Sequence, residues 1–323
     1  MVLRLSKAAA ASEPRETDGR SGDLRVSFVN NMPDAAFDHT EQQFLSLLET
    51  GAGKEVIEVR RHSMRGVARD EPTMAKIAER YSSMDTLIAD PPDILVITGS
   101  NPVEEDIANE PYWREMVEVL SWAKDHVGSI LLSCLSAHAA LKVFDGIERE
   151  QLEIKRTGVF SQDVVQDHPL TQGIGKEILL PHSRKNGVRS ELLEDAGYQL
   201  LIQSDEVGWS VATKDFGGAS VVLVQGHPEY EPSSLLREYR RDAGRYVRRE
   251  RDDLPVLPFH CVAAEDWDEL ERLHQAIIAG PRIPTMLDSY PFDEVGSRAP
   301  WSWRTPANSF YSNWLRRVAA SID

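Results

Sequence analysis

Cysteine is scarce in this 323-residue sequence, which contains only Cys134 and Cys261. Two cysteines so far apart do not form the disulfide framework of a small secreted domain and are more typical of a reducing compartment. The sequence also lacks an apolar run long enough for a signal peptide or a membrane span. We therefore expect a cytoplasmic protein with no membrane partner.

Positive charge is also in short supply. The chain has 36 Lys and Arg against 52 Asp and Glu, which gives a formal net charge of -16. Because phosphate binding requires a cationic face, this balance argues against a nucleic-acid partner. The sequence also has no compact group of His, Cys and Asp residues at zinc-ligand spacing. We expect no metal and no cofactor.

The sequence predicts one globular main domain with a different segment on each side of it. Its composition, 41% hydrophobic and 27% charged, is ordinary for a globular protein. Residues 1–23 are rich in Ser, Glu, Arg and Gly and predict a disordered leader. Residues 24–251 predict the main domain. Residues 252–323 predict a C-terminal extension that is irregular apart from an inserted helix and packs on the same domain.

Apolar strands alternate with helices in the main domain. Strand-like runs occur at 24–30, 54–63, 93–99, 129–134, 198–205, 207–214 and 219–230. Helical patterns follow at 109–127 and 232–250. This alternation predicts an α/β fold with a parallel sheet covered by helices on both faces, in which ligands bind at the carboxyl ends of the strands.

The segment LLSCLSAHAAL, residues 131–141, places Cys134 between a strand and a helix. A sharp turn between such elements presents a nucleophile at the top of a sheet, and a helix N-terminus lowers the pKa of a thiol. The alternative is a buried structural cysteine, since free cysteine is among the most buried residue types.

The segment GHPEY, residues 226–230, ends another predicted strand. His227 there is suited to accept the proton of a thiol, and Glu229 to hold the imidazole in one tautomer. The alternative is a loop histidine without a chemical role. The cysteine upstream on the same predicted sheet favours the catalytic interpretation.

Several motifs together resemble a known family. They are GHPEY followed by EY-RD, PHSR at 181–184, N-MP at 31–33, YW at 112–113 and NWL at 313–315. In this order and spacing the chain resembles the homoserine O-acyltransferases of methionine biosynthesis, MetA type, from about Leu24 to Leu315. That family is similar to the class I glutamine amidotransferases, so the resemblance implies a flavodoxin-like sheet.

The resemblance also implies roles for six residues. Cys134 matches the acyl-thioester cysteine, His227 the proton acceptor, and Glu229 the residue that orients the histidine. The substrate-binding positions are matched by Lys155, Ser183 and Arg241. For Arg241 the chemistry is sensible, because a guanidinium group captures a carboxylate with two hydrogen bonds. The alternative for Arg241 is a solvated helix face, since it belongs to a basic run.

Some positions depart from the family pattern. Leu135 replaces the usual Trp, although its backbone N–H is still available to an oxyanion hole. His138 replaces the usual Gln and either lines the pocket or packs within a helix. The segment 254–290 is longer than in the family, and we interpret it as an insertion near the active-site mouth or a subunit contact. Cys261 has no assigned role.

In the family that the chain resembles, a position shortly after the glycine matched by Gly99 selects the acyl donor. Ungapped counting places Val103 there, and one inserted residue places Glu104 there. No glycine opens the pocket in either alignment, and a glutamate would repel the free carboxylate of a succinyl group. This favours acetyl-CoA over succinyl-CoA. The alternative is that Glu104 and Glu105 face solvent.

The sequence therefore predicts a cytoplasmic enzyme, expected to be a homodimer, that transfers an acyl group from acetyl-CoA or succinyl-CoA to L-homoserine through Cys134. Three alternatives stay open: a serine O-acyltransferase, a glutamine amidotransferase-like hydrolase, and a binding protein that retained the scaffold. The elbow sequence S-C-L-S differs from the G-x-C-x-G of amidotransferases, which argues against the hydrolase.

Overall fold

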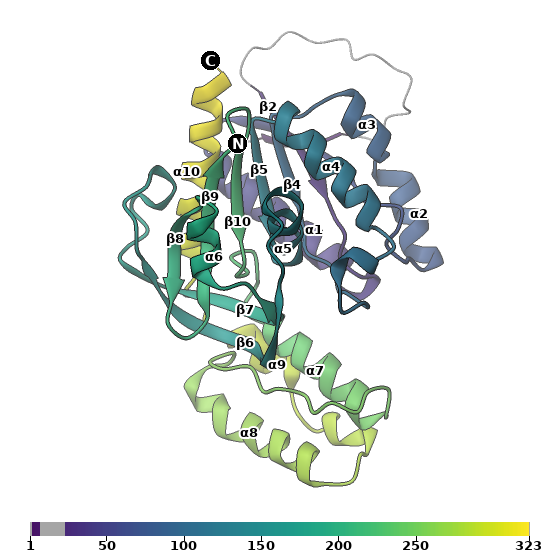
Figure 1. The fold of residues 1–323 in the computed structure, drawn as a ribbon. Coiled ribbons are helices and arrows are strands. Elements are labelled where there is room, and N and C mark those ends of the chain that lie inside the picture. Colours follow the sequence, from purple (N-terminus) through teal and green to yellow (C-terminus); the bar gives the residue numbers. More distant parts are fainter. Residues whose placement is uncertain (1, 7–22, 323) are drawn as a thin grey trace.

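A mixed sheet forms the centre of the molecule (Figure 1). The computed structural model describes residues 2–6 and 23–322. Within these residues the sheet has ten strands. In sheet order they are β1 (Val2–Leu5), β3 (Val56–His62), β2 (Leu24–Val29), β4 (Ile94–Ile97), β5 (Ser129–Ser133), β10 (Ser220–Val224), β9 (Gly208–Asp215), β8 (Gln199–Ser204), β6 (Glu150–Val164) and β7 (Glu177–Gly187).

The first six strands in this order pair in parallel, and the last four pair antiparallel. Every residue of the central strands β4 and β5 is buried, as expected for strands covered on both faces. The predicted parallel sheet is therefore confirmed. The prediction missed β6 and β7, because the charged first half of β6, EQLEIKRT, does not alternate like a half-buried strand.

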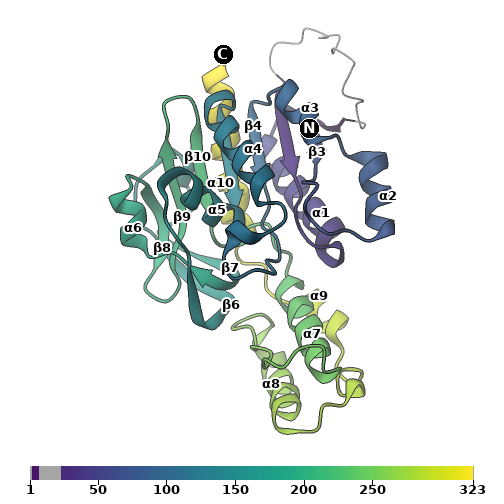
Figure 2. The ribbon, with the colours of Figure 1, turned by 45° about the vertical axis from the view of Figure 1, so that its right-hand side comes forward.

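Helices cover both faces of the sheet (Figure 2). They are α1 (Asp34–Ala52), α2 (Glu71–Arg80), α3 (Met84–Ala89), α4 (Trp113–His126), α5 (Leu135–Asp145), α6 (Ser190–Asp195), α7 (Ser234–Val247), α8 (Ala264–Ala279), α9 (Phe292–Arg298) and α10 (Arg304–Ile322). Apolar side chains of α3, α4, α5 and α6 fill the core on one face, and those of α1 and α10 fill the other. Short 3₁₀ turns lie at Ile107–Asn109, Pro169–Thr171 and Pro284–Leu287. None of the helices in the described ranges is long and apolar enough to cross a bilayer.

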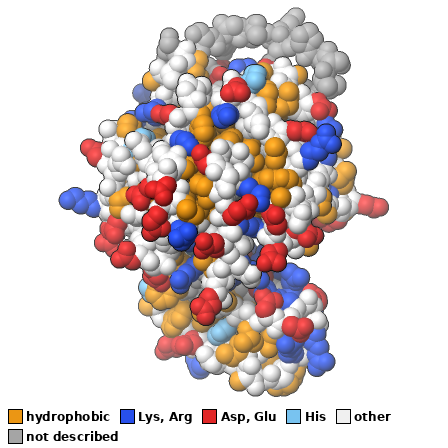
Figure 3. Space-filling model, viewed as in Figure 1, with side chains coloured by type: hydrophobic (Ala, Val, Ile, Leu, Met, Phe, Trp, Pro, Cys, Tyr) orange, Lys and Arg blue, Asp and Glu red, His pale blue; other side chains and the backbone are white. Residues whose placement is uncertain are grey.

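A third hydrophobic cluster joins α7, α8 and α9 to the strand β6. These helices form a lobe that bulges below the main body, with acidic and basic side chains interspersed over the visible face (Figure 3). The lobe contains helices from both sides of the predicted boundary at residue 251. Helix α7 packs with α8 and α9 through its apolar face, whereas α10, from the predicted extension, packs on α1 in the main body.

The N-terminal prediction also needs a correction. Residues Val2–Leu5, placed in the disordered leader, form the edge strand β1 and pair in parallel with β3. The apolar residues Leu3 and Leu5 are typical of such a strand. The rest of the predicted leader, residues 7–22, lies outside the described residues.

Buried histidines make the fold sensitive to acid. Burial lowers the pKa of both His62 and His138 from 6.5 to about 4. Between these values the unfolded chain binds protons that the folded chain does not, so the free energy of unfolding falls as the pH falls. We expect a loss of about 2 to 3 kcal/mol per histidine at pH 4.

Urea unfolding between pH 7 and pH 4.5 measures this loss. The His62→Asn variant keeps an N–H near the Ser83 carbonyl oxygen, which lies 3.0 Å from Nδ1 of His62, but it does not titrate. Its stability should depend less steeply on pH than that of the wild type. Identical slopes for the two proteins would contradict the role of His62.

Candidate active site

Cys134 occupies the sharp turn between β5 and α5, as the sequence predicts. Its backbone has φ 53° and ψ -110°, a conformation that costs energy for a residue other than glycine. The Cys134 N–H donates to the Val224 carbonyl oxygen at 2.7 Å, which holds the turn against the end of β10. The chain thus presents the thiol at the carboxyl edge of the sheet, at the N-terminus of α5.

Gly99 allows the loop after β4 to approach this turn. A Cβ at Gly99 would lie 3.3 Å from the Cys134 Cβ and 3.4 Å from the Leu135 nitrogen. The Leu135 N–H is the first of α5, and the first N–H groups of a helix have no acceptor within the helix. This donor beside the thiol is suited to stabilise an oxyanion.

His227 and Glu229 form a buried pair next to Cys134. Nδ1 of His227 lies 2.7 Å from Oε1 of Glu229, and the two residues are 7% and 3% exposed. Burial opposes protonation of His227, but the Glu229 carboxylate and the Cys134 sulfur outweigh it and hold the pKa of His227 well above its usual value. Nε2 of His227 meets no partner in regular hydrogen-bond geometry among the described residues and interacts with the sulfur.

Two further contacts fix the His227 ring and backbone. The Tyr230 ring stacks on the imidazole, with centroids 4.3 Å apart, and the His227 N–H donates to the Pro181 carbonyl oxygen at 2.8 Å. The Tyr230 hydroxyl in turn donates to Oε1 of Glu238 at 2.5 Å. Tyr230 therefore links the histidine to α7.

The three predicted substrate-binding residues converge on two carboxylates of α7. Ser183 donates to Glu238, and Lys155 lies 3.3 Å from Asp242 and 3.7 Å from Glu238. Nη2 of Arg241 lies 3.0 Å from Asp242. Burial opposes the charged form of Asp242, but Lys155 and Arg241 outweigh it and lower its pKa. The sequence analysis missed Glu238 and Asp242, whose i, i+4 spacing on a basic helix was the available signal.

The predicted donor-selecting positions lie on the loop between β4 and α4. Val103 is 86% exposed and Glu104 is also exposed. Their backbone N–H groups donate to Oε1 of the buried Glu110, at 2.6 Å and 2.8 Å. Glu104 is thus held at the surface of this loop by its backbone.

His138 and Cys261, to which the sequence assigned no definite role, are both buried and pack in the interior. Nε2 of His138 lies 2.8 Å from Oε1 of Gln225, and its lowered pKa keeps the ring neutral near pH 7. Cys261 is 2% exposed within the lobe, and burial raises the pKa of its thiol to about 12. A thiol with this pKa is a poor nucleophile at neutral pH.

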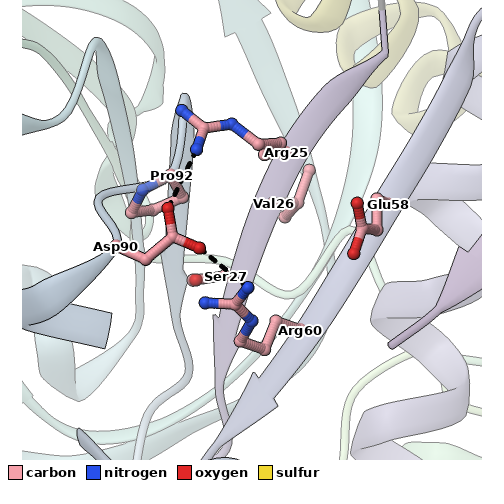
Figure 4. A pocket seen from close by; sticks show the side chains of 7 residues that line it. All are labelled: Arg25, Val26, Ser27, Glu58, Arg60, Asp90 and Pro92. Carbon is pink, nitrogen blue, oxygen red and sulfur yellow. Dashed lines mark hydrogen bonds and ion pairs between the residues drawn. The ribbon is translucent and has the colours of Figure 1, made fainter. Parts of the chain in front are cut away.

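Two hollows lie away from the Cys134 thiol. The smaller one holds about 10 Å³ and is lined by an ionic cluster in which Asp90 pairs with Arg25 and Arg60 (Figure 4). These charges satisfy one another and tie the turn after α3 to β2 and β3. The larger one, about 500 Å³, is lined by apolar residues of β6, β7 and the lobe, including Trp267 and Trp303.

The fold is similar to that of glutamine amidotransferases, with Cys134 at the turn between β5 and α5. A solved glutamine amidotransferase from Methylobacillus flagellatus superposes with a TM-score of 0.52 at 12% identity, over 91% of this chain and 94% of that one. One from Thermotoga maritima gives 0.51 at 11% identity, over 91% and 98%. These similarities confirm the predicted fold.

Sequence similarity identifies the family. The profile described as homoserine O-succinyltransferase matches residues 2–322. The homoserine O-succinyltransferase of Methylorubrum extorquens is 36% identical over 93% of this chain and 88% of that protein. The one from Bradyrhizobium japonicum is 38% identical over 96% and 95%. The chain therefore belongs to the homoserine O-succinyltransferase family and is a transferase, as the motifs predict.

Proposed function

We propose that this protein transfers an acyl group from an acyl-CoA to the hydroxyl of L-homoserine through a Cys134 acyl-enzyme. The observation that carries this proposal is the arrangement of Cys134, His227 and Glu229 at the ends of β5 and β10. The family supports the substrates, since its curated relatives are named homoserine O-succinyltransferases.

The proposed reaction has two balanced halves. His227 takes the Cys134 proton, the sulfur attacks the thioester carbonyl, and the CoA thiolate leaves with the proton from His227. His227 then takes the proton of the homoserine hydroxyl, which attacks the enzyme thioester, and the Cys134 sulfur leaves and takes that proton from His227. One base thus serves both steps, and the Leu135 N–H stabilises each tetrahedral oxyanion.

The charged cluster on α7 fits an amino-acid acceptor. Arg241 and Lys155 supply cations for the carboxylate, and Glu238 and Asp242 supply acceptors for the ammonium group. Tyr230 connects Glu238 to His227, so the charged cluster is joined to the proposed base by one residue.

We propose succinyl-CoA as the donor. The expected preference for acetyl-CoA required the Glu104 carboxylate beside the acyl group, whereas this side chain is exposed. The printed names of the relatives also favour succinyl transfer.

Intact-mass spectrometry after incubation with succinyl-CoA, without acceptor, tests the central step. A single added succinyl group on Cys134, released when homoserine is added, supports the proposal. Unmodified protein together with steady ammonia release from glutamine would favour the hydrolase instead. Unmodified protein with no turnover of either substrate would favour a binding protein.

A comparison of homoserine and serine tests the acceptor. The two differ by one methylene, which a pocket distinguishes by about 1 to 3 kcal/mol. We expect a higher kcat/KM for homoserine. A clear preference for serine would overturn the proposed acceptor.

The Arg241→Lys variant should raise the KM for homoserine more than the KM for the acyl-CoA. Lysine keeps the charge but loses the planar pair of N–H donors, and a charged hydrogen bond contributes about 1.5 to 3 kcal/mol. Steady-state kinetics with each substrate varied measures the effect. Arg240→Lys is the matched control, because Arg240 lies on the same helix and its side chain is 51% exposed. An unchanged KM for homoserine would place the carboxylate elsewhere.

A further inference from the structure

Two arginines from separate segments lie near the thiol. Arg149 follows α5, and Arg184 belongs to β7. Both guanidinium groups interact electrostatically with Cys134 and with His138, which lies one helical turn further along α5. Both positive charges therefore act on the reacting sulfur.

Neither arginine forms an ion pair with a carboxylate in the described part of the chain. Nη2 of Arg149 donates to the carbonyl oxygens of Glu104 and Glu105, at 3.3 Å and 2.9 Å. Nη1 of Arg184 donates to the Asn186 carbonyl oxygen at 2.9 Å, and Nη2 donates to that of Val207. The charges of Glu110 and Asp106 also act on Arg149, but neither carboxylate forms an ion pair with it.

These contacts leave buried donors unused. Nε and Nη1 of Arg149 and Nε of Arg184 are buried and have no hydrogen-bond partner among the described residues. Arg184 is 7% exposed, and burial lowers its pKa to about 10, so it keeps its charge at neutral pH. Buried N–H groups of a charged side chain are costly to leave unpaired, and a bound anion would satisfy them.

We propose that Arg149 and Arg184 form the subsite for the distal carboxylate of a dicarboxylic acyl group bound to Cys134. A guanidinium group is the preferred partner of a carboxylate, and a short dicarboxylic acyl chain ends close to the sulfur that carries it. An acetyl group has no such carboxylate and leaves both cations unpaired. The inference rests on the proposed acyl transfer and adds the residues that select its donor.

The Arg149→Gln variant tests the subsite through the ratio of two donors. For succinyl-CoA we expect kcat/KM to fall by about 10- to 150-fold, the range for one charged hydrogen bond, and for acetyl-CoA by less than about threefold. Arg149→Lys, which keeps the charge and a donor to the loop carbonyl oxygens, should show a smaller loss for succinyl-CoA. Arg189→Gln is the matched control, because Arg189 is 62% exposed and pairs with Glu150.

Loading of Cys134 provides a readout that does not require the acceptor. Intact mass measured over time should show slower succinylation of Arg149→Gln and unchanged acetylation. Arg184→Lys should shift the same ratio, with its melting temperature checked because Arg184 is buried. Free succinate should protect wild-type Cys134 from alkylation better than acetate does.

Three outcomes would count against the subsite. Equal losses of kcat/KM for both donors in Arg149→Gln would mean that the arginines act on the thiolate or on CoA itself. An unchanged kcat/KM for both donors would exclude Arg149 from donor selection. A wild-type enzyme that prefers acetyl-CoA would also overturn it. If neither succinyl-CoA nor acetyl-CoA modifies wild-type Cys134, the proposed acyl transfer itself is overturned.

Discussion

The Cys134→Ala variant should lose at least about 10⁴-fold in kcat for O-acylhomoserine formation, because no other group near His227 can form the thioester. Its fold should persist, since the substitution removes a single sulfur atom from a half-buried position. Product formation by mass spectrometry and the melting temperature measure the two effects.

Cys261→Ala is the matched control. Cys261 is the other cysteine of the chain, lies in the lobe and carries a thiol whose pKa burial raises. This variant should keep its activity and still become acylated once. Comparable turnover in Cys134→Ala and wild type would refute the acyl-enzyme.

The His227→Ala variant should show a similar loss, also at least about 10⁴-fold, because it removes the base used by both half-reactions. Both thiol acylation and transfer to homoserine should slow, which distinguishes His227 from a residue that binds one substrate. Single-turnover measurements of loading and discharge separate the two steps.

His39→Ala controls for the loss of a histidine, since His39 is exposed on α1. Glu229→Gln should reproduce part of the defect, because an amide no longer fixes the imidazole by charge. If loading proceeds normally in His227→Ala, then His227 is not the base for the first step.

Sequence patterns predicted the parallel half of the fold well, because its strands are short apolar runs buried on both faces. The inserted helix was also predictable, since α8 carries Trp267 and Leu270 on one face and ends at Gly280. Helix α1 begins at Asp34, directly after Pro33, at a position where proline is compatible with a helix start. Strands β6 and β7 gained their structure from pairing with each other, which no local pattern reveals.

The site was predictable where its residues occupy strand ends. Cys134, His227 and Glu229 follow apolar runs, so their proximity follows from the topology of the sheet. Glu238 and Asp242 lie in the EY-RD motif with i, i+4 spacing but were not singled out, because on a basic helix they resemble ordinary surface ion pairs. Arg149 and Arg184 gave no local signal, since an unpaired buried N–H group is visible only in three dimensions.

The separation of the lobe from the main body has an evolutionary consequence. The acceptor cluster on α7 depends on packing against α8 and α9, whereas Cys134 and the loop after β4 depend on the parallel sheet. Under the proposed function, substitutions on α7 other than at Glu238, which reaches His227 through Tyr230, should alter acceptor binding while the sheet still holds Cys134. The proposed acceptor site can therefore diverge more freely than the sheet that carries the thiol.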